Sequence, residues 1–160
     1  YGYSLQLSRA GKFNAQRAKE LEIPVDYWSV LPRGEEVVYE GKTYTSDMVM
    51  GAARKGLKIT YCTDTRPTER IIDEAFRSDL FICEGMYGEE DKLAKAKENK
   101  HMMMREAAEI ARDAEVAEAW MTHYSPATAR PAEFADMVKA ICPCMIMAKD
   151  RMEKVLNFEE

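Results

Sequence analysis

The sequence predicts an α/β domain in which helices cover a β-sheet. From Leu57 onward, short apolar runs alternate with amphipathic segments, and this alternation is typical of such folds. The 160 residues are enough for one domain with a sizeable core. No apolar run has the length needed to cross a bilayer, and no segment resembles a signal peptide. We therefore expect a single domain and no membrane partner.

The first third of the chain is predicted to be less regular than the rest. Residues 1–7 alternate enough to form a strand, and Asn14 can cap a short helix. Residues 24–36 have no clean period and contain proline and glycine, so we expect an exposed, protruding arm there. The segment VVYEGKTYT indicates a hairpin with its turn at 40–42.

The remaining strands and helices alternate along the chain. The expected strands cover residues 57–62, 80–83, 117–122, 145–147 and 155–158. The expected helices follow Thr68, cover 89–98 and 102–114, and begin again at Pro131, because proline suits a first helical position.

Ionisable groups follow three of these strands. Asp64 comes just after the first, Glu84 ends the second and His123 ends the third, while His101 begins a helix. Functional residues in α/β folds collect beyond the carboxyl ends of strands, so we expect several of these groups to converge along one sheet edge. The structural alternatives are ordinary: Asp64 suits a turn, and the two histidines suit polar loops.

Asp64 and His123 together have the chemistry of a metal site. A carboxylate and an imidazole are good ligands for zinc or manganese. Two ligands do not complete a catalytic zinc site, which usually has three protein ligands and a water. The Cys142-Pro-Cys144 segment lacks a second cysteine pair, so we interpret it as a turn.

Charge and cysteine content limit the possible functions. The net charge of −5 argues against a simple basic nucleic-acid binder, although residues 1–60 carry nine Lys/Arg against seven Asp/Glu. The four cysteines do not form the framework of a secreted disulfide-rich module. We therefore expect a reducing, cytoplasmic location.

Four motifs, in this order and at this spacing, resemble one known family. They are TYCTDTRP, LFICEGMYG, KHMMMREAAEIA and WMTHYSP. Together with the front segments YGYSLQL and GKFNAQRAKELEIP, they resemble the carboxyl-terminal half of tRNase Z, also called ribonuclease Z. This family consists of metal-dependent endoribonucleases that remove the 3′ trailer of precursor tRNA. The resemblance implies a metallo-β-lactamase-like four-layer α/β-β/α sandwich, of which residues 1–160 are the carboxyl-terminal half.

The resemblance also implies roles for individual residues. Asp64 matches an aspartate that bridges two metal ions, and His123 matches a histidine metal ligand. His101 matches a histidine that helps protonate the leaving oxygen, with Glu106 on its supporting helix. The substrate of the family is precursor tRNA. Arg66, two residues after Asp64, is suited to contact a phosphate of the tRNA and equally suited to pair with a nearby carboxylate. Tyr27, Trp28 and Arg33 would belong to the arm, where they would contact tRNA or, alternatively, a dimer partner.

The sequence also departs from the family pattern at positions that bear on metal binding and catalysis. The HxHxDH signature that supplies most metal ligands is absent, since no histidine precedes His101. Met103 replaces a usual threonine, and Ala148 replaces a usual glycine. We therefore expect a fragment of a longer protein that binds zinc weakly or not at all, although the intact family holds two zinc ions per site, with manganese possible. We also expect that this chain alone does not cleave RNA.

A half sandwich would leave one face of its sheet uncovered. We expect that apolar surface to be buried by self-association, as a homodimer, or by the missing amino-terminal half. Two other functions stay open from the sequence: a metallo-β-lactamase-fold phosphodiesterase acting on small substrates, and a degenerate, non-catalytic interaction module. The arm favours tRNA over a small substrate, and the retained Asp64, His101 and His123 argue against the degenerate module.

Overall fold

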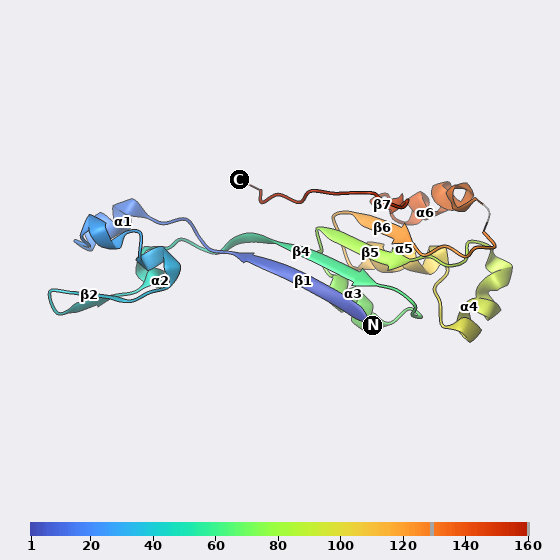
Figure 1. Ribbon diagram of the computed structural model, residues 1–160, viewed down its shortest axis with the longest axis horizontal. Helices are drawn as coiled ribbons and strands as arrows, with labels where there is room; N and C mark the ends of the chain where they lie inside the picture. The colour runs from blue at the N-terminus through green and yellow to red at the C-terminus, as the bar shows by residue number, and fades with distance from the viewer. Residues whose placement is uncertain (129, 160) are drawn as a thin grey trace. The chain divides into compact units, whose positions relative to one another are not determined.

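The computed structural model describes residues 1–128 and 130–159, which form two compact units (Figure 1). The first unit comprises Tyr1–Leu7 and the chain from Leu57 onward, and the second covers Ser8–Gly56. Each unit has its own apolar cluster. Residues 24–36 belong to the second unit, and their role as a protruding arm stays a prediction.

A five-stranded sheet organises the first unit. Its spatial order is β1 (Gly2–Arg9), β4 (Arg54–Cys62), β5 (Leu80–Glu84), β6 (Ala119–Thr122) and β7 (Met145–Met147). The last four strands are parallel, and β1 runs in the opposite direction (Figure 1). Parallel strands end at a common edge, so β4, β5 and β6 deliver the residues that follow them to the same place.

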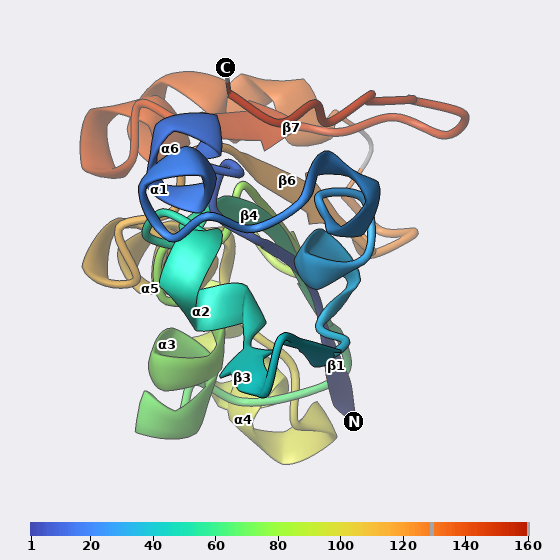
Figure 2. The same ribbon diagram turned by 90° about the vertical axis from the view of Figure 1, so that its left-hand side faces the viewer.

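Helices cover one face of this sheet. Figure 2 shows α3 (Glu69–Ala75), α5 (Met104–Asp113) and α6 (Ala135–Ile141) on one side of the strands. Alternate strand residues point to this side, and Phe81, Cys83 and Met121 pack there in the main core. Buried alanines on α5 allow the helix to approach the sheet closely.

Shorter helices complete the first unit. α4 (Leu93–Asn99) follows a 3₁₀ turn at Glu90–Lys92, and α6 follows another at Pro131–Phe134. The predicted helices after Thr68, near 89–98, at 102–114 and from Pro131 are therefore confirmed to within a few residues.

None of the helices α3, α5 and α6 lies on the opposite face of the sheet. Leu80 and Trp120 form a smaller apolar cluster there. Along β1, Tyr3 and Leu5 are 70% and 63% exposed. Ser4 lies between them in sequence and contacts Thr60 on the helix-covered side, with 3.2 Å between the two hydroxyl oxygens. Side chains alternate along a strand, so Tyr3 and Leu5 lie on the open face.

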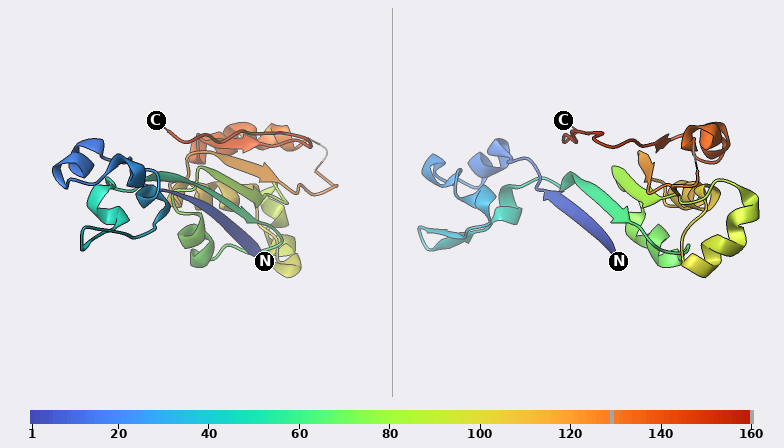
Figure 3. Two further views of the ribbon diagram at one scale, coloured as in Figure 1. Left: turned by 60° about the vertical axis from the view of Figure 1, so that its left-hand side comes forward. Right: turned by 45° about the vertical axis from the view of Figure 1, so that its right-hand side comes forward.

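One predicted strand is wrong. Residues 155–158 are extended but pair with no strand, and they are drawn as a plain coil after β7 (Figure 3). Met152 and Leu156 instead pack their side chains against the cluster around Leu80 and Trp120. The apolar pattern indicated burial correctly, but a strand also requires backbone partners along a sheet edge, which a sequence pattern does not reveal.

The second unit has a small core of its own. Its elements are α1 (Ala15–Glu20), 3₁₀ turns at Val25–Tyr27 and Leu31–Arg33, β2 (Val37–Tyr39), β3 (Lys42–Tyr44) and α2 (Ser46–Val49). Asn14 caps α1 as predicted, since its Oδ1 accepts the Arg17 N–H at 2.9 Å. The predicted hairpin is confirmed too, with Glu40 and Gly41 both in left-handed conformations at its tight turn.

Among the described residues, no helix combines the length and apolar character that a bilayer crossing requires.

Gly11 provides a test of packing in the second unit. A β-carbon at Gly11 would lie 1.9 Å from the carbonyl oxygen of Gly51, so Gly11→Ala forces backbone apart. We expect the free energy of unfolding to fall by about 1–3 kcal/mol, measured by denaturant titration. Gly51→Ala is the matched control, because its nearest contact would be an ordinary 3.4 Å. Equal effects of the two substitutions would contradict this packing.

Candidate metal and catalytic centre

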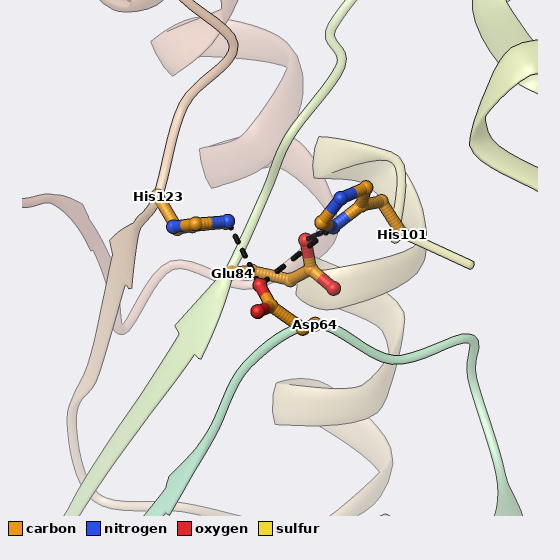
Figure 4. Close-up of side chains that lie close together, drawn as sticks. All are labelled: Asp64, Glu84, His101 and His123. Atoms are coloured by element: carbon orange, nitrogen blue, oxygen red, sulfur yellow. Dashed lines mark hydrogen bonds and ion pairs between the residues drawn. The ribbon is translucent and has the colours of Figure 1, made fainter. Parts of the chain in front are cut away.

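The ends of β4, β5 and β6 place three ionisable groups together. Glu84 ends β5 and pairs in register with Thr122, so His123 emerges next to it. Asp64 follows the end of β4, the strand on the other side of β5. Figure 4 shows their side chains turned toward one another, with His101 completing the group from the segment after α4. The predicted convergence along one sheet edge is confirmed.

Asp64 and His123 lie in direct contact. His123 Nε2 is 2.8 Å from Asp64 Oδ1, and His101 Nδ1 is 3.9 Å from the same oxygen. The rings of His101 and His123 are 5.6 Å apart between centroids. Asp64 is well exposed, with 63% of its side chain accessible, and His123 is 44% accessible. The pair therefore presents its ligand atoms at the surface of the first unit, and its role in metal binding stays a prediction.

Glu84 is the buried member of the group. Its side chain has no exposed surface, and a buried carboxylate is costly unless it is paired. One oxygen accepts the backbone N–H of Thr65 at 2.7 Å, and the other lies 2.7 Å from His101 Nδ1. An ionised carboxylate only accepts hydrogen bonds, so the contact is a hydrogen bond to ionised Glu84 in the form of His101 that carries a proton on Nδ1. The other ring nitrogen, Nε2, is then free to exchange a proton with a bound molecule.

Sequence reasoning noted Glu84 as a strand-end group but assigned it no role. A signal was present in the chain: the apolar run LFIC leads without a turn residue into a charged one. A carboxylate that directly continues a buried strand has to find partners in the fold, and these partners are often functional groups.

The backbone is strained at the loops that carry the group. Asp64 and His123 adopt left-handed conformations, with φ of 50° and 56°, and Lys100, just before His101, has φ of 60°. Residues other than glycine rarely adopt this region, and each instance costs about 1 kcal/mol or more. Asparagine, aspartate and histidine tolerate it best, which suits Asp64 and His123.

Arg66 and Glu106 form a bidentate ion pair close to this group. Arg66 Nη1 donates to Glu106 Oε2 at 2.8 Å, and its Nη2 pairs with Oε1. Glu106 also accepts the N–H of Met103 at 2.9 Å. The ion pair is one of the two alternatives that the sequence left open for Arg66. Contact with a substrate phosphate stays untested.

The predicted arm residues lie in the second unit and outside this group. Trp28 donates from Nε1 to the carbonyl of Ile23 at 3.0 Å, and its ring lies 5.5 Å from that of Phe13. The ring of Tyr27 is 5.9 Å from that of Tyr39. These two aromatic side chains are half-buried in their own unit, whereas Arg33 is exposed.

The cysteines do not add ligands to the group. Among the described residues, the group of possible ligands includes no cysteine. Burial raises the pKa of Cys62 to about 12 and raises the pKa of Cys83 well above its usual range. Cys142-Pro-Cys144 forms a turn, as predicted, in which Met145 donates its N–H to the carbonyl of Cys142 at 3.0 Å.

The donor set fits a hard or borderline divalent cation. Among the described residues, the one group of possible ligands is Asp64, Glu84, His101 and His123, whose ligand atoms all lie within 4.8 Å of one another. Imidazole and carboxylate suit zinc and manganese. Glu84 and His101 already satisfy each other, which leaves Asp64 and His123 as the pair best placed for an ion.

A family model now identifies the superfamily. The model described as a β-lactamase superfamily domain matches residues 37–124, more than half of the chain. The chain belongs to the β-lactamase superfamily. The predicted α/β class and metallo-β-lactamase-like fold are confirmed, and the described sheet with its helical layer accounts for part of such a sandwich.

Curated relatives within the superfamily are more specific. The chain is 54% identical over its whole length to a protein named ribonuclease Z from Lachnospira eligens, and it covers 53% of that protein. It is 50% identical to ribonuclease Z of Clostridium acetobutylicum over 157 residues, which are 98% of this chain and 51% of the relative. The predicted resemblance to ribonuclease Z is confirmed. The chain spans about half the length of the curated relatives it matches.

Solved structures show a weaker likeness. The short form of human tRNase Z superposes with a TM-score of 0.46 and 22% identity over 60% of this chain and 32% of that one. A long-form RNase Z from yeast superposes with a TM-score of 0.41 and 28% identity, over 44% of this chain and 9% of that one. These superpositions are partial, so the family rests on the sequence matches.

Glu84 is the best position to test the group. We expect Glu84→Ala to lower the free energy of unfolding by about 1–3 kcal/mol, because it leaves the Thr65 N–H and His101 Nδ1 without their acceptor. Denaturant titration measures the change, with the exposed Glu98→Ala as control. A loss no larger than that of the control would contradict a paired, buried carboxylate.

Proposed function

We propose that this chain is the carboxyl-terminal half of a metal-dependent endoribonuclease that removes the 3′ trailer of precursor tRNA. The observation that carries the proposal is the group Asp64, Glu84, His101 and His123 at the strand ends of a chain 54% identical to a ribonuclease Z. A site of two exposed ligands beside a buried acid–histidine pair suits hydrolysis of a phosphodiester.

In this proposal Asp64 and His123 hold zinc, with manganese as the alternative. A bound divalent ion lowers the pKa of a coordinated water and stabilises negative charge on the attacked phosphate. Asp64, whose carboxylate is exposed, would hold the ions together with His123. Because two ligands are fewer than a catalytic zinc site uses, this chain alone binds zinc weakly or not at all and is inactive.

His101 acts as the general acid. Glu84 holds the proton on Nδ1 and stabilises the protonated ring electrostatically, since its carboxylate is buried and 2.7 Å away. Nε2 then donates its proton to the leaving oxygen of the cleaved strand. Glu106 supports this arrangement through its contacts to Arg66 and to the backbone of Met103.

Tyr27, Trp28 and Arg33 are proposed to contact precursor tRNA through the arm at 24–36. The exposed guanidinium of Arg33 can meet a phosphate, and the partly exposed rings can stack on bases or riboses. A phosphate contact by Arg66 would require it to leave Glu106 in part.

The free state of all four cysteines is compatible with a cytoplasmic location.

The open face of the sheet is proposed to receive the half of the protein that this chain lacks. Leu80 and Trp120 on this face are buried with Met152 and Leu156 packed against them, whereas Tyr3 and Leu5 are exposed, so the apolar surface left to cover lies along β1. The chain covers 53% of the Lachnospira relative, so a segment of similar size is available to cover it. Without that segment, two copies of the chain can bury the same surface, which supports a homodimer.

The nuclease activity can be tested by reconstitution. We expect this chain, fused to the amino-terminal part of the Lachnospira eligens ribonuclease Z, to remove the 3′ trailer of a precursor tRNA in the presence of zinc or manganese. Asp64→Asn should abolish cleavage, and His101→Gln should slow it by about 10²–10⁴-fold, because a general acid contributes that much. Glu98→Gln is the surface control.

The other functions predict different results in this assay. A fusion that binds metal and hydrolyses bis(p-nitrophenyl) phosphate but leaves the precursor tRNA intact would favour a small-molecule phosphodiesterase. A fusion that binds no metal and cleaves neither substrate would favour a non-catalytic module. Either result would overturn the proposed function.

The open sheet face gives a separate prediction. We expect the purified chain to self-associate and Leu5→Lys to raise the dissociation constant at least about tenfold, since burying a leucine contributes about 1.5–3 kcal/mol. Sedimentation velocity over a concentration series measures this dissociation constant. Gln6→Lys is the matched control, because Gln6 is the next residue of β1 and points to the other face. A monomer at all concentrations would contradict the prediction.

A further inference from the structure

Two neighbouring residues anchor the loop that carries Asp64. The N–H of Thr65 donates to Glu84, and the side chain of Arg66 reaches the segment around His101. Asp64 directly precedes both anchors. The backbone that presents the aspartate is therefore attached to the acid at the end of β5 and to the histidine segment at the same time.

The side chain of Arg66 contacts the backbone of His101. Its Nη1 donates to the carbonyl oxygen of His101 at 2.6 Å, and the same nitrogen donates to Glu106 at 2.8 Å. Three-quarters of the Arg66 side chain is buried, with 24% accessible, and 14% of the Glu106 side chain is accessible. Partial burial strengthens these contacts relative to exposed ion pairs.

Glu106 binds both Arg66 and the segment that follows His101. It lies in the first turn of α5, and it accepts the N–H of Met103 at the start of that helix. The backbone from His101 to Met103 is therefore held at both ends of a short segment, by Arg66 at the carbonyl of His101 and by Glu106 at the amide of Met103. The rigid helix α5 supports both contacts.

We propose that Arg66 is a positioning residue for His101. Its guanidinium, fixed by Glu106, holds the backbone of His101 so that the imidazole stays against Glu84 and close to Asp64. Lysine cannot replace it, because an ammonium group lacks the planar fork that reaches two carboxylate oxygens and a carbonyl together. The consequence for catalysis rests on the proposed function, whereas the effect on His101 does not.

Magnetic resonance of the histidine rings tests the proposal without a substrate. The protein has two histidines, so His123→Gln assigns the ring signals of His101. In Arg66→Met we expect the His101 Nδ1 proton to exchange with water at least about tenfold faster. The loss of a hydrogen bond that involves a charged group shifts the equilibrium between the held and the released segment by at least that factor. Arg66→Lys should restore little of the protection, and Glu106→Gln should give an intermediate effect.

Arg105→Met is the matched control. Arg105 is adjacent to Glu106 and also binds two carboxylates, Glu90 at 3.1 Å and Glu109 at 2.8 Å. Within the described part of the chain, it forms no hydrogen bond with the backbone of His101. It should lower thermal stability without changing the exchange of the His101 ring proton. An unchanged His101 signal in a folded Arg66→Met protein would overturn the proposal, and Glu106→Gln decides the question if Arg66→Met does not fold.

The reconstituted fusion separates positioning from phosphate binding. If Arg66 positions His101, Arg66→Met lowers kcat on precursor tRNA and leaves KM nearly unchanged. A rise in KM that depends on salt, with kcat and the His101 signal unchanged, would show instead that Arg66 contacts a phosphate and would overturn the proposal. A fusion without any activity refutes the proposed function, while the ring signal still tests the role of Arg66.

Discussion

The carboxylate of Glu84, buried at the end of β5, is the constraint on which the site depends. A charge without exposed surface has to be matched by donors, and the donors here are the amide of Thr65 and the imidazole of His101. These two partners come from the loop after β4 and from the segment before α5. By satisfying one buried acid, the fold brings together the loops that carry Asp64 and His101.

The parallel sheet supplies the rest of the geometry. In a parallel arrangement the residues that follow neighbouring strands emerge side by side, so His123 reaches Asp64 across the end of β5. The left-handed conformations of Asp64 and His123 turn both chains immediately after their strands. Both turns follow a paired part of the sheet, where residues 81–84 of β5 lie in register with 119–122 of β6.

The uncovered face of the sheet links the fold to the length of the chain. Helices bury one face, and the other presents exposed apolar side chains along β1, where Tyr3 and Leu5 lie. The chain covers about half the length of its curated relatives, and the proposed function places the other half of the protein on this face. In the proposed function, that half also supplies further metal ligands, so one segment would complete both the apolar packing and the metal site.

The sequence by itself determined the α/β class, most element positions, the hairpin at Glu40–Gly41 and the convergence of Asp64, His101 and His123. It could do so because these features depend on local pattern: apolar periodicity, turn residues, and polar groups that follow strands. Only the tertiary structure decided that residues 155–158 form no strand, that Arg66 pairs with Glu106, and that Glu84 is the buried partner of His101. Each of these depends on which distant group occupies the space beside a side chain or backbone, and that choice is made by packing across the whole unit.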